Sequence, residues 1–205
     1  MDGVLLLSSP LHDRAYREAF ASLPIRDFDY RSIAGMRTDE AIQLVLTKNG
    51  IAYTEEQLHA LAGAKTRIAR DLIARDNPIA PHCIDVLNAL ARVYPLALAS
   101  SASQATVDLF LSSNGLREKF RSVLHGGDVH RAKPAPDIYQ LACSRISLEP
   151  SECLVVEDAV SGVEAGKAAG TVVWGITTTS SSDELTRAHA DHIISSLEEL
   201  LALTK

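Results

Sequence analysis

The first third of the chain carries the apolar spacing of amphipathic helices. In the stretch PLHDRAYREAFASL, apolar residues recur on one helical face at Leu11, Ala15, Ala19 and Leu23. Similar spacing continues with few interruptions, so we expect residues 12–76 to be almost entirely helical.

Two later helices of this segment also show where they begin and end. The stretch TDEAIQLVLTKNG begins with Thr38, a residue type favoured at the N-cap, and ends at Gly50. The stretch TEEQLHALAGAKTRIARDLIARD starts with a capping box of Thr54 and Gln57 and runs to about Asp76. These signals predict two separate helices rather than one continuous one.

Beyond Pro81 the pattern changes to short apolar strands that alternate with helices. We expect strands in PLALAS, SVLHG, CLVVED, TVVWGI and DHIIS, and helices in the stretches around them, the last being LEELLAL. This alternation predicts a parallel sheet covered on both faces, hence an α/β fold with a Rossmann-like, doubly wound core. We expect residues 1–11 and 77–205 to form the core domain and residues 12–76 an inserted helical domain.

Composition narrows the range of partners. The 205 residues are 46% hydrophobic and 22% charged, as in ordinary globular proteins, and the net charge is −6 with no long Lys/Arg cluster. We therefore expect no nucleic-acid partner. No apolar run approaches the roughly 18 residues of a membrane span and no secretory signal is visible, which predicts a cytoplasmic protein without a membrane partner.

The three cysteines, Cys83, Cys143 and Cys153, are widely spaced and odd in number, and no CxxC occurs. This pattern suggests neither a disulfide framework nor a zinc site. We expect buried free thiols, as in a reducing compartment.

Polar residues with a common chemistry follow the predicted strands. LALAS ends at Ser100, CLVVED ends in Glu157 and Asp158, and KPAPD places Lys133 just before a helix that starts with proline. In an open parallel sheet, ligands bind beyond the carboxyl ends of the strands. We therefore expect these side chains to converge on one edge of the sheet.

This set of side chains suits phosphoryl transfer. Lys133 and Ser100 can supply charge and hydrogen bonds to phosphate oxygens, and a strand-end carboxylate is a hard oxygen ligand for Mg²⁺. Taken singly, each residue could have an ordinary structural role. Ser100 could be a helix cap, Lys133 a surface lysine, and Glu157 with Asp158 a favourable charge at a helix N-terminus. Their occurrence in order on three successive β-α units favours a site.

With these motifs in place, the chain resembles the haloacid dehalogenase superfamily of phosphotransferases, in the subgroup with a helical cap after the first strand. It is particularly similar to β-phosphoglucomutase-like and phosphoglycolate-phosphatase-like members. The likeness rests on MDGVLLLSSPLH, LALASSAS, KPAPDIY and VVEDAVSGVEAGKAAG, and it covers essentially the whole chain.

The resemblance implies a role for each matching residue. Asp2 matches an aspartate that acts as general acid/base and lends its carbonyl to Mg²⁺, the implied cofactor. Ser100 matches the residue that binds the transferring phosphoryl group, and Lys133 matches the lysine that neutralises the nucleophile and the phosphate. Asp158, with Glu157 beside it, matches the acidic Mg²⁺ position.

The resemblance also implies a nucleophilic aspartate two positions before Asp2, where an aspartyl-phosphate would form. Only Met1 precedes Asp2 in this sequence. In the family the nucleophile ends a central first strand, whose neighbours would otherwise have unpaired backbone groups beside an opened core. We expect that the sequence starts too far downstream; the alternative is a relative that has no nucleophile.

Substrate selection is expected from the helical insertion, acting as a cap that excludes water. Its polar candidates are His12 in the hinge, Arg37 in GMRTDE and Lys65 in AKTRIAR, and Ser101 joins them from the core. The alternative is that each of these residues of the cap lies on a solvent-exposed face of a helix. Leu7 stands where close relatives often carry an aspartate, which puts the hinge contacts of that aspartate in doubt.

The function expected from the sequence is Mg²⁺-dependent phosphoryl transfer. The reaction is expected to be the hydrolysis of a small phosphorylated metabolite of the phosphosugar or phosphoglycolate type. The other possibility of the same class is the isomerisation of a hexose phosphate by a mutase. Asp2 argues against dehalogenation, because phosphate-ester chemistry uses this residue as proton donor to the leaving group. The alternative is a catalytically degenerate relative that binds a phosphorylated metabolite. We expect a monomer or a weak dimer.

Overall fold

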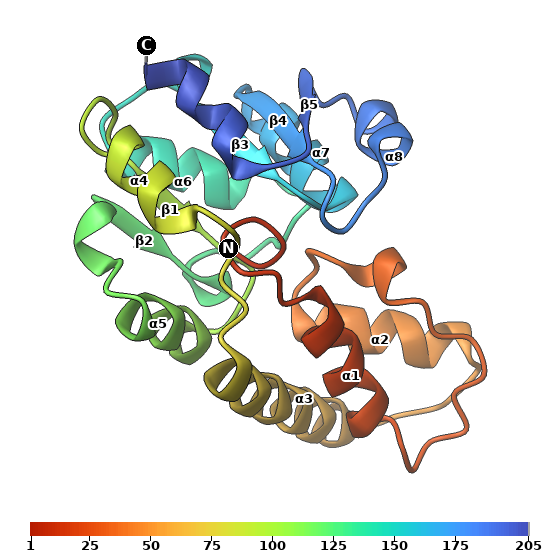
Figure 1. Ribbon diagram of the computed structural model, residues 1–205. Helices are drawn as coiled ribbons and strands as arrows, with labels where there is room; N and C mark the ends of the chain where they lie inside the picture. The colour runs from red at the N-terminus through yellow and green to blue at the C-terminus, as the bar shows by residue number, and fades with distance from the viewer. Residues whose placement is uncertain (205) are drawn as a thin grey trace.

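The computed structural model describes residues 1–204 and is built around five parallel strands. They form two separate pieces of sheet: β1 (Ala97–Ala99) pairs with β2 (Ser122–Leu124), and β3 (Leu154–Glu157) pairs with β4 (Val172–Ile176), which pairs with β5 (His192–Ile194). Figure 1 shows both pieces among the helices. The predicted α/β fold with a parallel sheet is confirmed.

Helices cover both faces of these strands. One apolar core packs α4 (Cys83–Leu90), α5 (Gln104–Ser113) and the 3-10 helix η5 (Leu197–Thr204) on one face. A second core packs α6 (Asp137–Arg145), α7 (Val160–Ala169) and α8 (Ser182–Arg187) on the other. Short 3-10 turns η2 (Arg117–Lys119), η3 (Gly126–Asp128) and η4 (Pro150–Glu152) complete this part. Helices on both faces make the arrangement doubly wound, as expected.

Residues 9–76 contain no strand. Their elements are α1 (Ser9–Ala19), the 3-10 turn η1 (Tyr30–Ile33), α2 (Thr38–Lys48) and α3 (Glu55–Asp76). They bury a core of their own, which includes Tyr16, Phe20 and Ile42. In Figure 1, α1 and α3 run side by side at one side of the molecule.

The helix ends test two sequence predictions. The capping box of Thr54 and Gln57 is confirmed, because the Thr54 side chain accepts from the Gln57 N–H and the Gln57 side chain accepts from the Thr54 N–H. The prediction that Thr38 is an N-cap is wrong by one position. Arg37 has the extended backbone of the cap, and Thr38 is the first helical residue.

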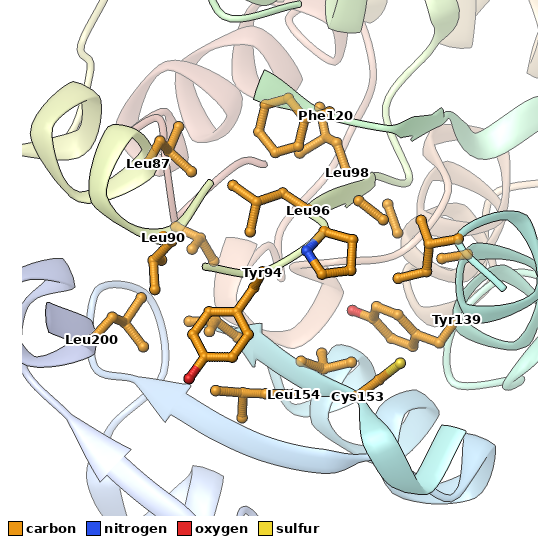
Figure 2. Close-up of a pocket in the computed structure, with 18 of the residues that line it drawn as sticks. Leu87, Leu90, Tyr94, Leu96, Leu98, Phe120, Tyr139, Cys153, Leu154 and Leu200 are labelled. Carbon is orange, nitrogen blue, oxygen red and sulfur yellow. The ribbon is translucent and has the colours of Figure 1, made fainter. Parts of the chain in front are cut away.

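A cavity of about 380 Å³ separates the two pieces of sheet. β1 and β3 line it from opposite sides, and in residues 1–204 neither has a strand partner on that side. Figure 2 shows Leu96 and Leu98 on one side, with Leu154 and Cys153 across from them. The opened core and the unpaired strand neighbours expected from the sequence are therefore present.

All three cysteines are free thiols, with Cys83 and Cys143 buried and Cys153 half-buried. Burial was expected for all three, so Cys153 departs from the prediction. Within residues 1–204, no helix has the length and apolar character needed to cross a membrane.

Candidate active site

Lys133 and Glu157 form a buried ion pair at the end of β3. The Lys133 Nζ lies 2.5 Å from the Glu157 Oε1, and both side chains are under a tenth exposed. The hydroxyl of Tyr139 donates to the same oxygen, and the Glu157 Oε2 accepts from the Asp158 N–H at 3.1 Å. Burial would raise the pKa of Glu157, but the ammonium of Lys133 and these hydrogen bonds hold it below its usual value. Glu157 is thus a carboxylate with both oxygens engaged.

Asp158 lies directly against the N-terminal loop. Gly3 has a φ of +68°, and a Cβ there would lie 1.8 Å from the Asp158 Oδ2, so only glycine allows this contact. Burial, and then the charge of Glu157, raises the pKa of Asp158 to about 7. The N-terminal loop is also held by Thr178, whose hydroxyl donates to the Gly3 carbonyl. A hydrogen bond with Thr179 and the charge of the N-terminal ammonium lower the pKa of Asp158 only in part, so it is a buried acid with a raised pKa.

Asp2 is held by two donors from the start of the helical segment. Its Oδ1 accepts from the Ser8 hydroxyl at 2.5 Å and lies 3.0 Å from the His12 Nε2. Burial would raise the pKa of Asp2, but its interactions with His12 and Ser8 bring it well below its usual value. In this geometry Asp2 is an ionised carboxylate that can accept a proton.

Lys65 extends this chain of contacts into α3. Its Nζ lies 3.2 Å from the His12 Nδ1 and 4.3 Å from the centre of the Tyr16 ring. An ammonium only donates, so Nδ1 accepts and Nε2 carries the proton that points to Asp2. Burial, and then the Lys65 charge, lowers the pKa of His12, which agrees with a neutral ring. Burial lowers the pKa of Lys65 to about 8.

The loop between η1 and α2 docks on the strand-end loops of the core. The Arg37 Nη2 donates to the carbonyls of Val129 and His130, at 2.9 and 3.1 Å. The Ser101 hydroxyl donates to the Gly35 carbonyl at 2.8 Å. Arg37, Ser101 and Lys133 also line one small cavity of about 10 Å³. Residues predicted from both segments therefore meet next to the ion pair.

A second contact of this loop was not predicted from the sequence. The Ser161 hydroxyl donates to the Ala34 carbonyl at 3.1 Å. Gly35 has a φ of +79°, and a Cβ there would lie 2.6 Å from the Ser161 Oγ. The close approach explains why glycine stands at this position. No periodicity or motif marks such a contact, because it depends on two loops far apart in the chain.

Ser100 behaves differently from its neighbours. It is buried at the end of β1, as expected, but its Oγ accepts from the Ala102 N–H at 3.1 Å. This bond closes a turn within the loop and is not a helix cap, because α5 begins at Gln104 and has Ser103 at its N-cap. In the described chain, no recorded hydrogen bond joins its side chain to the other predicted site residues. Tyr139 is a further residue of the site that sequence reasoning missed, although it lies within the KPAPDIY motif.

The acidic residues give a partial metal site. Residues 1–204 contain no group of three His, Cys, Asp or Glu residues arranged to hold a metal. Asp158 is buried and Asp2 is half-buried, and the charge of Asp2 contributes to the raised pKa of Asp158. A hard divalent cation would offset this repulsion, and the oxygens present are of the type that Mg²⁺ prefers. The residues therefore fit Mg²⁺ by their chemistry, while Glu157 would have to give up a hydrogen bond to join them.

Sequence comparison finds named phosphatases among the proteins that this chain resembles. Fructose-1-phosphate phosphatase YqaB of Escherichia coli (strain K12) is 28% identical over 170 residues, which cover 83% of this chain and 89% of that protein. Phosphorylated carbohydrates phosphatase of Thermotoga maritima is 30% identical over 176 residues, covering 83% of this chain and 79% of that protein.

Solved structures share the fold over nearly the whole chain. CbbY from Rhodobacter sphaeroides in complex with phosphate has a TM-score of 0.83 at 28% identity, covering 98% of this chain and 93% of that one. β-Phosphoglucomutase from Clostridium difficile has a TM-score of 0.85 at 24% identity, covering 97% and 89%. A family model of haloacid dehalogenase-like hydrolases matches residues 1–170. With most of the chain matched, the resemblance is confirmed: this protein belongs to the haloacid dehalogenase-like hydrolases.

Proposed function

We propose that this protein is a Mg²⁺-dependent phosphatase of small phosphorylated carbohydrates. The observation that carries the proposal is the buried group at the carboxyl edge of the sheet, where Lys133, Glu157 and Asp158 lie next to the loop of Asp2. The names of two relatives, a fructose-1-phosphate phosphatase and a phosphorylated carbohydrates phosphatase, support the substrate class. A hexose-phosphate mutase is the second candidate, supported by the shared fold with β-phosphoglucomutase.

The phosphoryl group would be held on the core side of the site. The ammonium of Lys133 is already aimed at the strand ends by its bond to Glu157, so it can neutralise phosphate oxygens without reorganisation. Ser100 and Ser101 would add hydrogen bonds at the end of β1. Asp158 and Asp2 would hold Mg²⁺, which supplies positive charge to the phosphoryl oxygens when bound.

Asp2 would move the protons of the reaction. The transfer would pass through an aspartyl-phosphate, the intermediate that the family resemblance implies. Asp2 would give a proton to the departing sugar oxygen and later take one from the attacking water. Its ionised state in this geometry suits the second step, because His12 and Ser8 both donate to it. For the first step, Asp2 must receive a proton, which a movement of His12 on α1 would make easier.

Residues 12–76 would act as a cap over this site, with residues 1–11 and 77–205 as the core. The docking of Arg37 and Gly35 on the core and the contact of His12 with Asp2 support a closed arrangement. In the proposal Arg37 leaves the carbonyls of Val129 and His130 to bind the substrate, and Lys65 reaches the same space from α3. Closure would exclude water other than the reacting one.

Phosphate release tests this function directly. The protein should release phosphate from phosphorylated carbohydrates in the presence of Mg²⁺. Removal of Mg²⁺ by a chelator should abolish the release, and its return should restore it. Saturable binding of these compounds without any release or isomerisation would contradict the proposal and support a degenerate binding protein.

A further inference from the structure

The loop that follows β4 reaches the end of β3. The Thr177 N–H donates to the Ile194 carbonyl and the Ser180 N–H donates to the Asp158 carbonyl, both at 3.1 Å. Thr179 lies between these two anchored positions and is half-buried. Its side chain therefore starts from a backbone that the core holds on both sides.

The Thr179 hydroxyl joins the core to the helical segment of residues 9–76. It lies 2.7 Å from the hydroxyl of Ser9, the first residue of α1, and it also hydrogen bonds with the Asp158 side chain. Each hydroxyl has one proton to donate, whereas a carboxylate only accepts. Thr179 therefore donates to Asp158, and Ser9 donates to Thr179.

The same line of contacts continues from Ser9 to the loop that docks on the core. The Tyr30 hydroxyl hydrogen bonds with Ser9, and the Tyr30 ring stacks on the His12 ring, with the ring centres 6.4 Å apart and the planes inclined by 17°. Tyr30 is the first residue of η1, which leads directly into the loop of Gly35 and Arg37. Ser9 thus connects the Thr179 hydroxyl to the part of the helical segment that touches the core.

The two connections between the helical segment and the core leave this orienting task to side chains. The Leu7 N–H donates to the Pro78 carbonyl at 2.7 Å, and the Ala80 N–H donates to the Leu5 carbonyl at 2.9 Å. These bonds join one connection to the other, and Leu7 packs with the apolar core and carries no polar group. The hydroxyl contact at Ser9, two residues further on, is therefore well placed to set the direction in which α1 leaves the core.

We propose that Thr179 is a positioning residue, which ties α1 to the end of β3 through Ser9 and so holds residues 9–76 docked on the core. Its hydroxyl is suited to this task because both of its hydrogen bonds leave its own loop, one to the core and one to the helical segment. The positional claim is independent of the proposed function, and only its kinetic consequence rests on that function.

Limited digestion with trypsin tests this role without substrate or metal. Cleavage after Arg37 reports undocking, because the Arg37 side chain bonds to core carbonyls while the helical segment is docked. Cleavage after Arg145, in α6 of the core, reports unfolding of the whole protein in the same sample. Mass spectrometry of the fragments gives both rates.

Three variants and one control share this assay. Thr179→Val keeps the shape of the side chain and removes its hydroxyl, Thr179→Ser keeps the hydroxyl, and Ser9→Ala removes the same contact from the side of α1. Thr177→Val is the matched control, because Thr177 is exposed in the same loop.

Thr179→Val and Ser9→Ala are each expected to speed cleavage after Arg37 by roughly three- to tenfold, as the loss of one hydrogen bond predicts, with cleavage after Arg145 unchanged. Thr179→Ser and Thr177→Val should match the unmodified protein. The double variant of Ser9→Ala and Thr179→Val should be no faster than the faster single variant, because both changes remove the same contact.

Unchanged cleavage after Arg37 in Thr179→Val would overturn the proposal, and so would additive effects in the double variant. An equal rise after Arg37 and Arg145 would also overturn it, because Thr179 would then support the stability of the whole protein and not the placement of the helical segment. If Thr179→Val fails to fold, Ser9→Ala gives the same comparison.

Kinetics separates this inference from the proposed function. With fructose 1-phosphate and Mg²⁺, Thr179→Val should raise KM by a larger factor than it lowers kcat, because saturating substrate favours the docked arrangement, and Thr179→Ser should restore both. Faster cleavage after Arg37 in a protein that releases no phosphate would uphold the positioning role and contradict the proposed function. Unchanged cleavage in a protein that does release phosphate would contradict the positioning role and uphold the function.

Discussion

Lys133→Met tests whether the buried ion pair organises the strand-end site. The substitution keeps most of the apolar volume of the side chain and removes its charge. Glu157 would then retain only the Tyr139 hydroxyl and the Asp158 N–H as donors. Because Glu157 is under a tenth exposed, water cannot replace the lost ammonium.

The expected magnitude follows from this burial. Breaking a buried pair by removal of one partner typically costs about 3–5 kcal/mol. For a chain of this size, each kcal/mol lowers the midpoint of thermal unfolding by about 2–4 °C. Lys133→Met should therefore lower the midpoint by roughly 6–20 °C.

Lys167→Met is the matched control. Lys167 contacts Asp191 at 2.6 Å, a distance similar to that of the buried pair, but the two side chains are 33% and 40% exposed. Exposed pairs typically contribute about 0.2–1 kcal/mol, so this variant should lose no more than about 4 °C. Thermal unfolding followed by circular dichroism, with urea unfolding for the free energies, measures both.

The double variant Lys133→Met/Glu157→Gln completes the cycle. Neutral glutamine keeps an acceptor for Tyr139 and removes the unpaired charge, so the double variant should recover at least about 2 kcal/mol over the single one. Equal losses for Lys133→Met and Lys167→Met, or no recovery in the double variant, would refute the reasoning that the buried charge pair sets the cost.

Two further predictions concern the loop that docks on the core and the thiols. Gly35→Ala should loosen this loop, because its Cβ would meet the Ser161 hydroxyl; limited proteolysis should cut the variant faster there, whereas Gly63→Ala, with nothing within 4 Å of its Cβ, should leave the rate unchanged or lower. Equal rates for both variants would contradict the docking role. Burial raises the pKa of Cys83 to about 11 and of Cys143 to about 12, so at pH 8 iodoacetamide should label half-buried Cys153 first and the other two only on unfolding. Mass spectrometry after brief labelling checks the order, and early labelling of Cys83 would disprove it.

The sequence was most informative where a local pattern has a local cause. Apolar runs bounded by turns marked all five strands, because a strand covered on both faces must be apolar throughout. The capping box of Thr54 and Gln57 was predictable for a similar reason, since both of its hydrogen bonds span three residues. The strand-end position of Glu157 and Asp158 followed directly from the strand before them.

Contacts between loops that are distant in the chain could not be predicted from the sequence. Arg37 was predicted to aim at substrate, but nothing in its neighbourhood predicts that it would donate to the carbonyls of Val129 and His130. The contact of Ser161 with the Ala34 carbonyl has no sequence signal either, because small polar residues occur throughout loops. The sequence predicts that Ser100 lies at a strand end, but it does not predict which group its hydroxyl bonds to.

The central claim is that Asp2 moves protons in phosphoryl transfer at this site. Its most direct test is the kcat for phosphate release from fructose 1-phosphate, or from the best phosphorylated carbohydrate found, with Mg²⁺ present. Asp2→Asn should lower kcat by about 10²–10⁴-fold, the usual contribution of general acid/base catalysis, while Asp108→Asn, on the exposed side of α5, should leave it unchanged. An Asp2→Asn variant as active as the Asp108→Asn control would contradict the account.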